Sequence, residues 1–165
     1  MTPEALFSLL DDLEIDTQTY HHPPVATVAE AKAHWAEIDA VHCKNLFFKD
    51  AKGVYWLVVV PFARELNIKT LHKTIGAKRL SFGSADRLRE VLAVEPGSVT
   101  PFALINDTGH QVNLVLDAWM MAQDLVAYHP LVNTMTTTVA PEGLMRFLSH
   151  TGHAPQLLDL SDQNA

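Results

Sequence analysis

The segment 97–101 has the residue types of a loop that binds a carbonyl oxygen or an oxyanion. Glycine can adopt backbone angles closed to other residues, and proline fixes its own φ and restricts the residue before it. Such a loop can hold free backbone N–H groups pointing one way, as stabilisation of a developing negative charge requires. The alternative is a tight turn that leads into a core strand. The residues of this candidate loop are Gly97, Ser98, Val99, Thr100 and Pro101.

Lys44 stands out because it interrupts an apolar stretch that reads as a strand. A lysine in such a setting can hold an anionic group, act as a base with a lowered pKa, or place its charge in solvent at a sheet edge. Its neighbour Cys43 has the opposite strand parity, so the two side chains should face opposite sides of the sheet. A cysteine nucleophile needs a histidine base, and His42 shares the face of Lys44. We therefore interpret Cys43 as a small buried hydrophobic residue.

Two groups of histidines have side chains that could act in chemistry or bind a metal. His129 precedes a proline, so its backbone should be extended; a lone histidine of this kind is a hydrogen-bonding residue or a catalyst. His21 and His22 are adjacent, but neighbouring side chains diverge in extended backbone and no third ligand stands at a recognised metal-site spacing. The sequence therefore predicts no metal site.

The sequence predicts helices, several of them with capping residues, in the segments between the candidate residues. Thr2, Thr27, Asn67 and Ser84 precede apolar residues at helical spacing, and Pro141 begins the last such pattern. Extended segments are expected at 15–20, 40–49, 54–60, 78–82, 102–105, 112–116, 134–139 and 157–160. The segment 54–60 is apolar on both faces, which predicts a central strand covered on both sides. In contrast, the alternation around Asn113 predicts a half-exposed strand.

Length and composition indicate one domain, residues 1–165, with a sizeable core. No apolar run approaches the ~20 residues of a membrane span, and the N-terminus lacks the pattern of a signal peptide. The single cysteine excludes an internal disulfide and fits a reducing cytoplasm. We therefore expect a cytoplasmic protein without a membrane partner.

The charge is unevenly distributed along the chain. Residues 31–89 contain eleven of the twelve Lys and Arg residues against five acids, a balance of +6, whereas the remainder has one Arg and fourteen acids, or −13. The two parts return the net charge of −7. A basic middle within an acidic chain is either a footprint for a polyanion or a set of solvated surface charges. The acidic total, and the lack of a helix-turn-helix with a basic recognition helix, disfavour DNA binding.

Four motifs in order resemble one family. The chain is similar to the YbaK / prolyl-tRNA-synthetase-associated editing domains over about residues 2–160, and it looks most like their stand-alone ProX (PrdX) type. That type deacylates mischarged alanyl-tRNA(Pro). The motifs are Lys44-Asn45-Leu46-Phe47-Phe48, Lys78-Arg79-Leu80-Ser81-Phe82, Gly97-Ser98-Val99-Thr100-Pro101-Phe102 and His129-Pro130-Leu131-Val132-Asn133-Thr134.

The resemblance implies a fold and a reaction. The fold is a single α/β domain with a mixed, strongly curved β-sheet surrounded by helices. The reaction is hydrolysis of the aminoacyl ester on tRNA(Pro) charged with the wrong amino acid, with no cofactor and with prolyl-tRNA synthetase as a candidate partner. A synthetase pocket for proline cannot strongly exclude a smaller apolar side chain, since a lost methylene is worth only ~1–3 kcal/mol, so a second hydrolytic site restores accuracy.

The resemblance also implies roles for residues. Lys44 matches the family lysine, placed to contact the phosphate of the terminal adenosine or the ester. The 97–101 amides face the aminoacyl group, and His129 orients water or gates the pocket. The candidate substrate contacts are Asn45, Asn133, and, for size selection, Val25, Ala26 and Leu46. The candidate contacts to the tRNA acceptor stem are Lys69, Lys73, Lys78 and Arg79. Two alternatives remain: a deacylase for cysteinyl-tRNA(Pro) or another small amino acid, and an aminoacyl-tRNA binding module without catalysis.

Overall fold

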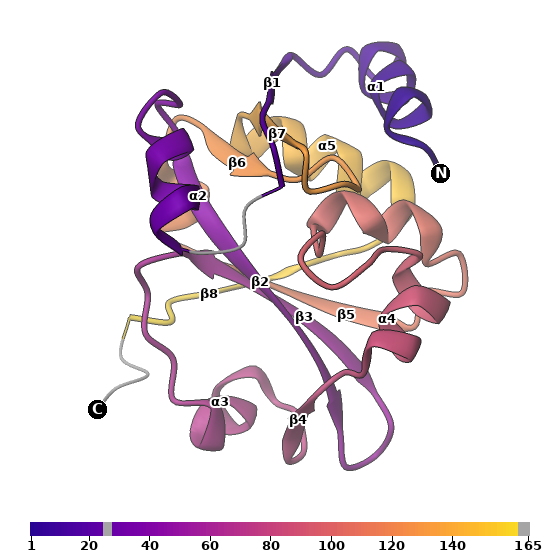
Figure 1. The fold of residues 1–165 in the computed structure, drawn as a ribbon. Coiled ribbons are helices and arrows are strands. Elements are labelled where there is room, and N and C mark those ends of the chain that lie inside the picture. Colours follow the sequence, from indigo (N-terminus) through magenta and orange to yellow (C-terminus); the bar gives the residue numbers. More distant parts are fainter. Residues whose placement is uncertain (25–27, 162–165) are drawn as a thin grey trace.

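The computed structural model describes residues 1–24 and 28–161, which form one eight-stranded mixed sheet with helices on both faces (Figure 1). The strand order is β1-β7-β6-β2-β3-β5-β8, and β4 pairs with β2 beside this path. The strands are β1 (Thr17–His21), β2 (Val41–Asp50), β3 (Tyr55–Pro61), β4 (Leu80–Phe82), β5 (Val112–Asp117), β6 (Val126–Tyr128), β7 (Met135–Val139) and β8 (Gln156–Leu158). The pairs β2–β6, β3–β5 and β5–β8 are parallel and the others antiparallel.

The helices begin where capping residues stand in the sequence. Thr2, Asn67 and Ser84 each accept a backbone N–H with the side-chain oxygen, and Gly76 ends α3 in the left-handed conformation. These features confirm the corresponding sequence predictions, whereas Thr27 lies outside the described residues. The helices are α1 (Pro3–Asp12), α2 (Val28–Trp35), α3 (Ile68–Ile75), α4 (Ala85–Leu92) and α5 (Pro141–Thr151), with short 3₁₀ helices η1 (Pro101–Asn106) and η2 (Met120–Ala122).

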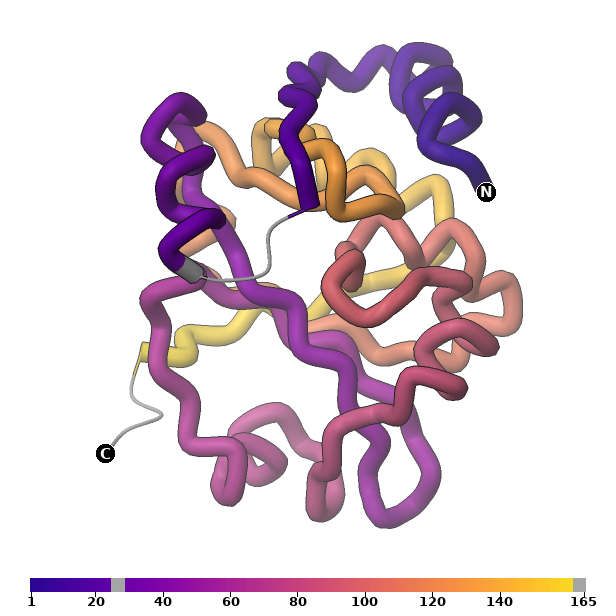
Figure 2. Tube along the Cα trace, viewed as in Figure 1, coloured from indigo at the N-terminus to yellow at the C-terminus, as the bar shows by residue number. Residues whose placement is uncertain are grey.

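Two hydrophobic cores occupy the two faces of the sheet. Leu57 and Val59 of β3 face the larger core, which α1, α4, α5 and η1 cover, while Val58 and Val60 face the smaller core beneath α3. Every residue of β3 is buried, as predicted for a central strand. Figure 2 shows β2 and β3 running together between α2 on one side and the chain from α4 to η1 on the other.

Two sequence predictions about strands are wrong. The segment 102–105 is helical, because Pro101 begins η1 and the Thr100 hydroxyl accepts the N–H of Phe102 at 3.3 Å. Strand β5 is also more buried than its alternation suggested: of its residues only Asn113 is exposed. The reason is long-range, since β5 lies between β3 and β8 and Val115 packs into the smaller core.

Within the described residues, no helix has the length and apolar character needed to cross a membrane.

Candidate functional site

Strand β2 carries the Lys44-Asn45-Leu46 motif where one of its edges is open. On the edge away from β3, β2 pairs with β6 at Val41 and His42 and with β4 from Phe48 onward. The residues between these two pairings have ladder partners on β3 alone. An open edge leaves strand residues accessible from the plane of the sheet. The loop after α4 supplies the 97–101 segment, and the loop after β6 supplies His129 and Asn133.

Asn45 and His129 line the same small cavity, which has a volume of about 40 Å³. The Oδ1 atom of Asn45 is buried and has no hydrogen-bond partner among the described residues. Buried polar atoms are nearly always paired, so an unpaired one needs an explanation, and a ligand that donates a hydrogen bond supplies one. The other residues around the cavity are Trp35, His42, Cys43, Ala127, Tyr128 and Thr136.

The His129 ring is held in one orientation and one tautomer. Its Nδ1 lies 2.8 Å from the carbonyl oxygen of Met135, which can only accept, so Nδ1 carries the proton and donates. In the neutral ring Nε2 is then an acceptor with a free lone pair. Burial lowers the pKa of His129 below 6.5; the bond to Met135 acts in the opposite direction, and repulsion from His22 lowers the pKa further. His129 is therefore a neutral proton acceptor at pH 7.

Two other histidine rings lie near His129. The ring of His22 stacks on His34 at 5.2 Å and lies 6.3 Å from the ring of His129. Its Nδ1 donates to the carbonyl oxygen of Pro23 at 2.9 Å, and its Nε2 is hydrogen-bonded to the Thr136 hydroxyl at 2.8 Å. Across residues 1–24 and 28–161, no group of three or more His, Cys, Asp or Glu side chains is arranged to hold a metal ion.

The pKa of His129 predicts a pH dependence. We expect the acid limb of kcat/KM for ester hydrolysis to fall at a pH below 6.5, because protonation removes the Nε2 lone pair. His22→Gln should move that limb to higher pH, since it removes a repulsive charge. The free energy of unfolding should change in the same window: the contribution of neutral His129 is complete above pH 6.5 and is lost as the pH falls toward the lowered folded-state pKa. An unshifted limb in His22→Gln would contradict this assignment.

The 97–101 loop leaves backbone donors unused. Gly97 has φ +91°, a conformation that favours glycine. Ser98 is buried and its N–H donates to the carbonyl oxygen of Glu95 at 2.9 Å, so this amide, expected to be free, is occupied. The N–H groups of Gly97, Val99 and Thr100 have no hydrogen-bond partner in the described part of the chain. Pro101 has no N–H and serves to start η1.

Asn133 joins this loop to the loop that carries His129. A Cβ atom built on Gly97 would lie 3.8 Å from Nδ2 of Asn133, so the side-chain amide sits beside the glycine. Leu131 between His129 and Asn133 has φ +73°, which is unusual for a branched residue and indicates that the surrounding structure enforces this backbone. A cleft of about 480 Å³ separates the two loops; Arg89, Ala93, Val94, Glu95, Pro96, Ser98, Leu131, Val132 and Asn133 line it.

Lys44 lies on the other face of β2. Strand alternation places Cys43, Asn45 and Phe47 toward the larger core, and Lys44 with Leu46 toward the smaller one. Lys44 makes no hydrogen bond or ion pair to the 97–101 loop among the described residues. Burial lowers its pKa, and the nearby Glu65 carboxylate opposes that shift. This position suits contact with the nucleic-acid part of a substrate better than contact with the ester.

The other predicted residues are distributed as follows. Leu46 packs against the smaller core and does not line the Asn45–His129 cavity, so it is not placed for size selection. Val25 and Ala26 lie outside the described residues. The basic residues are exposed on α3 and just before β4, and α3 packs on the same face as Lys44. These basic residues are Lys69, Lys73, Lys78 and Arg79.

Cys43 is not a nucleophile. Burial raises the pKa of its thiol to about 12, so almost no thiolate forms at neutral pH. The raised pKa agrees with the interpretation of Cys43 as a non-nucleophile, but the residue is only partly buried, against the larger core. In contrast, His22 and Thr136 were not predicted as neighbours of His129. Only the unusual density of histidines between positions 21 and 42 could have drawn attention to them.

The fold and the motif residues agree with comparisons to known proteins. The model of the aminoacyl-tRNA editing domain family matches residues 22–147. "Prolyl-tRNA editing protein ProX" of Acetoanaerobium sticklandii is 35% identical over 159 residues, covering 95% of this chain and 96% of that protein. "Prolyl-tRNA synthetase associated domain-containing protein 1" of Bos taurus is 38% identical over 165 residues, covering 97% and 95%.

A solved structure confirms the architecture. A crystal structure provisionally described as a trans-editing enzyme for prolyl tRNA synthetase superposes with a TM-score of 0.69 at 17% identity, over 95% of this chain and 96% of that one. The chain belongs to the aminoacyl-tRNA editing domain family. It is thus an enzyme of the deacylase class, which hydrolyses the ester between an amino acid and the 3′ end of tRNA.

Proposed function

We propose that the chain hydrolyses mischarged tRNA(Pro) in trans, with alanyl-tRNA(Pro) as the preferred substrate. The observation that carries this proposal is the small cavity where the unpaired Oδ1 of Asn45 and the ring of His129 meet. The curated relatives named for prolyl-tRNA editing and for association with prolyl-tRNA synthetase support the tRNA and the synthetase as partners.

The size of the cavity supports selection of a small amino acid. Its volume is about 40 Å³, and one water-sized group occupies roughly 10–15 Å³ of such space. A methyl side chain and a hydrolytic water fit together in that volume. The ring of proline would displace the water, which would protect correctly charged tRNA. The Asn45 carbonyl oxygen can accept a hydrogen bond from the substrate ammonium group and orient it.

The chemistry needs no protein nucleophile because the substrate is an activated ester. Water attacks the ester carbonyl carbon, and Nε2 of His129 accepts a proton from that water. The unpaired N–H groups of Gly97, Val99 and Thr100 stabilise the negative charge on the carbonyl oxygen. When the carbon–oxygen bond to the ribose breaks, the proton passes to the ribose oxygen. The products are the free amino acid and tRNA with an intact 3′ end.

The basic residues on α3 and before β4 are proposed to bind the acceptor stem. Lys44 on the same face would hold a phosphate near the 3′ end. We expect the logarithm of the affinity to fall linearly with the logarithm of salt concentration, and each of Lys69→Ala, Lys73→Ala, Lys78→Ala and Arg79→Ala to reduce the slope by about 1. Arg87→Ala, an exposed arginine paired with Glu90, is the matched control and should leave the slope unchanged. An affinity that does not depend on salt concentration would contradict binding of the acceptor stem by these basic residues.

The proposal is tested by single-turnover hydrolysis of alanyl-, cysteinyl- and prolyl-tRNA(Pro), with Lys44→Ala compared under the same conditions. Release of alanine alone, with a large loss in Lys44→Ala, is the expected result. Release of cysteine in preference to alanine would show that cysteinyl-tRNA(Pro) is the preferred substrate and would leave the proposed ester hydrolysis unchanged. If no ester is cleaved although the tRNA binds, the chain is a binding module and the roles of His129 and the loop fail.

A further inference from the structure

A cavity separate from the Asn45–His129 cavity opens where β3 and β5 end. Its volume is about 270 Å³, and Pro61, Ala63, Arg64 and Trp119 line it. Strands β3 and β5 are parallel, so their carboxyl ends meet at this edge of the sheet. In open α/β sheets, ligands bind outside the carboxyl ends of the strands. The motifs of the sequence analysis include none of these four residues.

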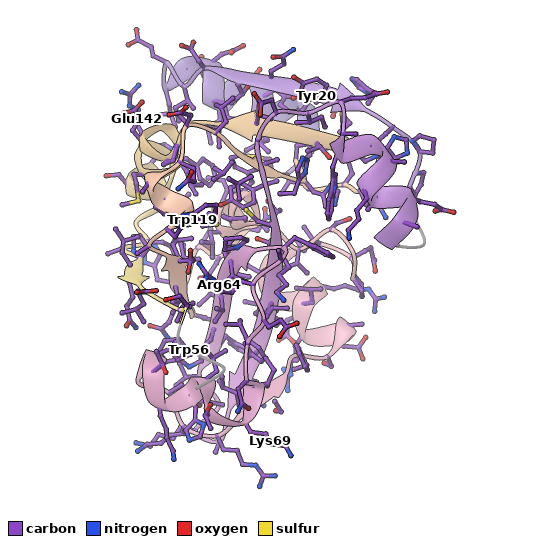
Figure 3. The ribbon with its side chains drawn as sticks, turned by 90° about the vertical axis from the view of Figure 1, so that its left-hand side faces the viewer. Tyr20, Trp56, Arg64, Lys69, Trp119 and Glu142 are labelled. Atoms are coloured by element: carbon purple, nitrogen blue, oxygen red, sulfur yellow. The ribbon has the colours of Figure 1, made fainter. Side chains whose placement is uncertain are left out.

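Trp119 is unusual among the tryptophans of this chain. It is 51% exposed, whereas Trp56 is 7% exposed and Trp35 packs between the rings of His42 and Phe62. Figure 3 shows Trp119 and Arg64 on the same face of the molecule. An exposed indole offers a broad apolar ring face, and an arginine beside it can stack on a second planar group.

Arg64 is anchored from beneath by a buried acid. Its Nη2 lies 3.3 Å from Oδ2 of Asp117, which is fully buried and also accepts the N–H of Met120 at 2.9 Å. The Nε of Arg64 and the Oδ1 of Asp117 have no partner among the described residues. In the described residues, Arg64 and Asp117 therefore share a single hydrogen bond and do not form a bidentate pair. The Nε–H donor of Arg64 and the Oδ1 acceptor of Asp117 remain unused.

The cavity and Lys44 lie on the same face of the sheet. Lys44 is opposite Val60 in the β2–β3 ladder, and Asp117 is one residue beyond the pairing of Val59 with Leu116. Lys44, Val60 and Asp117 thus form one row across three neighbouring strands, about 5 Å apart from strand to strand. Lys44 and the acid that anchors Arg64 thus lie on the same side of the sheet, with the buried Val60 between them.

We propose that an unpaired nucleobase of the tRNA 3′ end stacks on Trp119 beside the Arg64 guanidinium. This rests on the proposed function only for the identity of the substrate. The charges at the cavity favour a base over a phosphate, because Asp117 pairs with Arg64 and Asp159 also lies near Arg64. Stacking on an exposed aromatic ring is a general way to hold single-stranded nucleic acid and tolerates any base.

The test is a thermodynamic cycle on equilibrium binding of uncharged tRNA(Pro). Affinities of wild type and Trp119→Ala are measured for intact tRNA and for tRNA shortened by one, two or three 3′ nucleotides. Wild type should lose affinity about 5- to 100-fold on removal of the stacked nucleotide, the range typical of one base–aromatic stack. Trp119→Ala should bind intact and shortened tRNA equally weakly. Trp119→Phe should keep most of the wild-type difference, which controls for folding.

The outcomes separate this inference from the proposed function. Equal affinity of Trp119→Ala and wild type for intact tRNA would overturn the stacking site. A loss of affinity from wild type to Trp119→Ala that is the same for intact and for shortened tRNA would also overturn it. A wild-type protein that hydrolyses no ester but shows the coupling keeps the stacking site while the proposed function fails. A wild-type protein that hydrolyses the ester but shows no coupling keeps the proposed function, while the stacking site fails.

Discussion

Gly97→Ala should lower kcat for deacylation about 100-fold, the size of effect that follows from misplacing one donor to an oxyanion. Gly97 holds φ +91°, which an alanine adopts only with strain. Space is not the obstacle, because the added Cβ would lie 3.8 Å from Nδ2 of Asn133. The backbone would instead relax and displace the N–H groups of Gly97 and Val99. KM should change little, since the proposed tRNA contacts lie elsewhere.

A matched control separates this effect from a general loss of stability. Gly53 has φ +81° in the turn between β2 and β3, and a Cβ there would meet only Lys49 Cε at 3.9 Å. Gly53→Ala should therefore lose a similar ~1 kcal/mol of folding free energy and keep its kcat. Single-turnover rates and thermal unfolding of the two variants make the comparison. Equal rates in Gly97→Ala and Gly53→Ala would show that the loop does not stabilise the transition state.

Asp107→Ala should lower the free energy of unfolding by about 3–5 kcal/mol, because it removes a buried carboxylate that accepts three hydrogen bonds, and each unsatisfied donor costs about 1–3 kcal/mol. Asp107 is 2% exposed and ends the segment that begins with the 97–101 loop. Its Oδ1 accepts the N–H of Gln111, and its Oδ2 accepts the N–H of Val112 and the Nε2–H of His153, all at 2.9 Å. Removing the carboxylate leaves these donors unpaired in the interior.

Chemical denaturation of Asp107→Ala, Asp107→Asn and Asp159→Ala measures this effect. Asp107→Asn keeps one acceptor oxygen and should lose less than the alanine variant. Asp159 is exposed and bonds to Ser161 nearby, so its replacement should change stability by no more than about 0.5 kcal/mol. If Asp107→Ala unfolds at the same denaturant concentration as Asp159→Ala, the buried network does not hold η1 against the end of α5.

Local chemistry made part of the fold predictable. Thr2, Asn67 and Ser84 begin helices because their side chains satisfy N–H groups a few residues away, an interaction that the sequence displays directly. The buried strand β3 was predictable for a similar reason, since an apolar run of this length on both faces fits a covered central strand.

Long-range pairing could not be predicted from local chemistry. Residues 102–105 are as apolar as a strand, and only the capping of η1 by Thr100 and its burial beneath α4 and α5 make them helical. The alternation of side chains along β2 correctly placed Cys43 and Lys44 on opposite faces of the sheet. Alternation alone did not show that Asn45 and His129 would line the same cavity. That meeting depends on the parallel pairing of β2 with β6, which joins segments about eighty residues apart in the chain.

The open stretch of β2 between β6 and β4 places two consecutive candidate residues on opposite faces of the sheet. Asn45 lines the small cavity, and Lys44 lies on the face that α3 covers. In the proposed function, the amino acid lies on the first face of this strand and the polynucleotide on the second. The proposal then makes amino-acid choice and tRNA choice physically separable. It follows that substitutions around His129 should change the amino acid that is removed while the same tRNA continues to be bound.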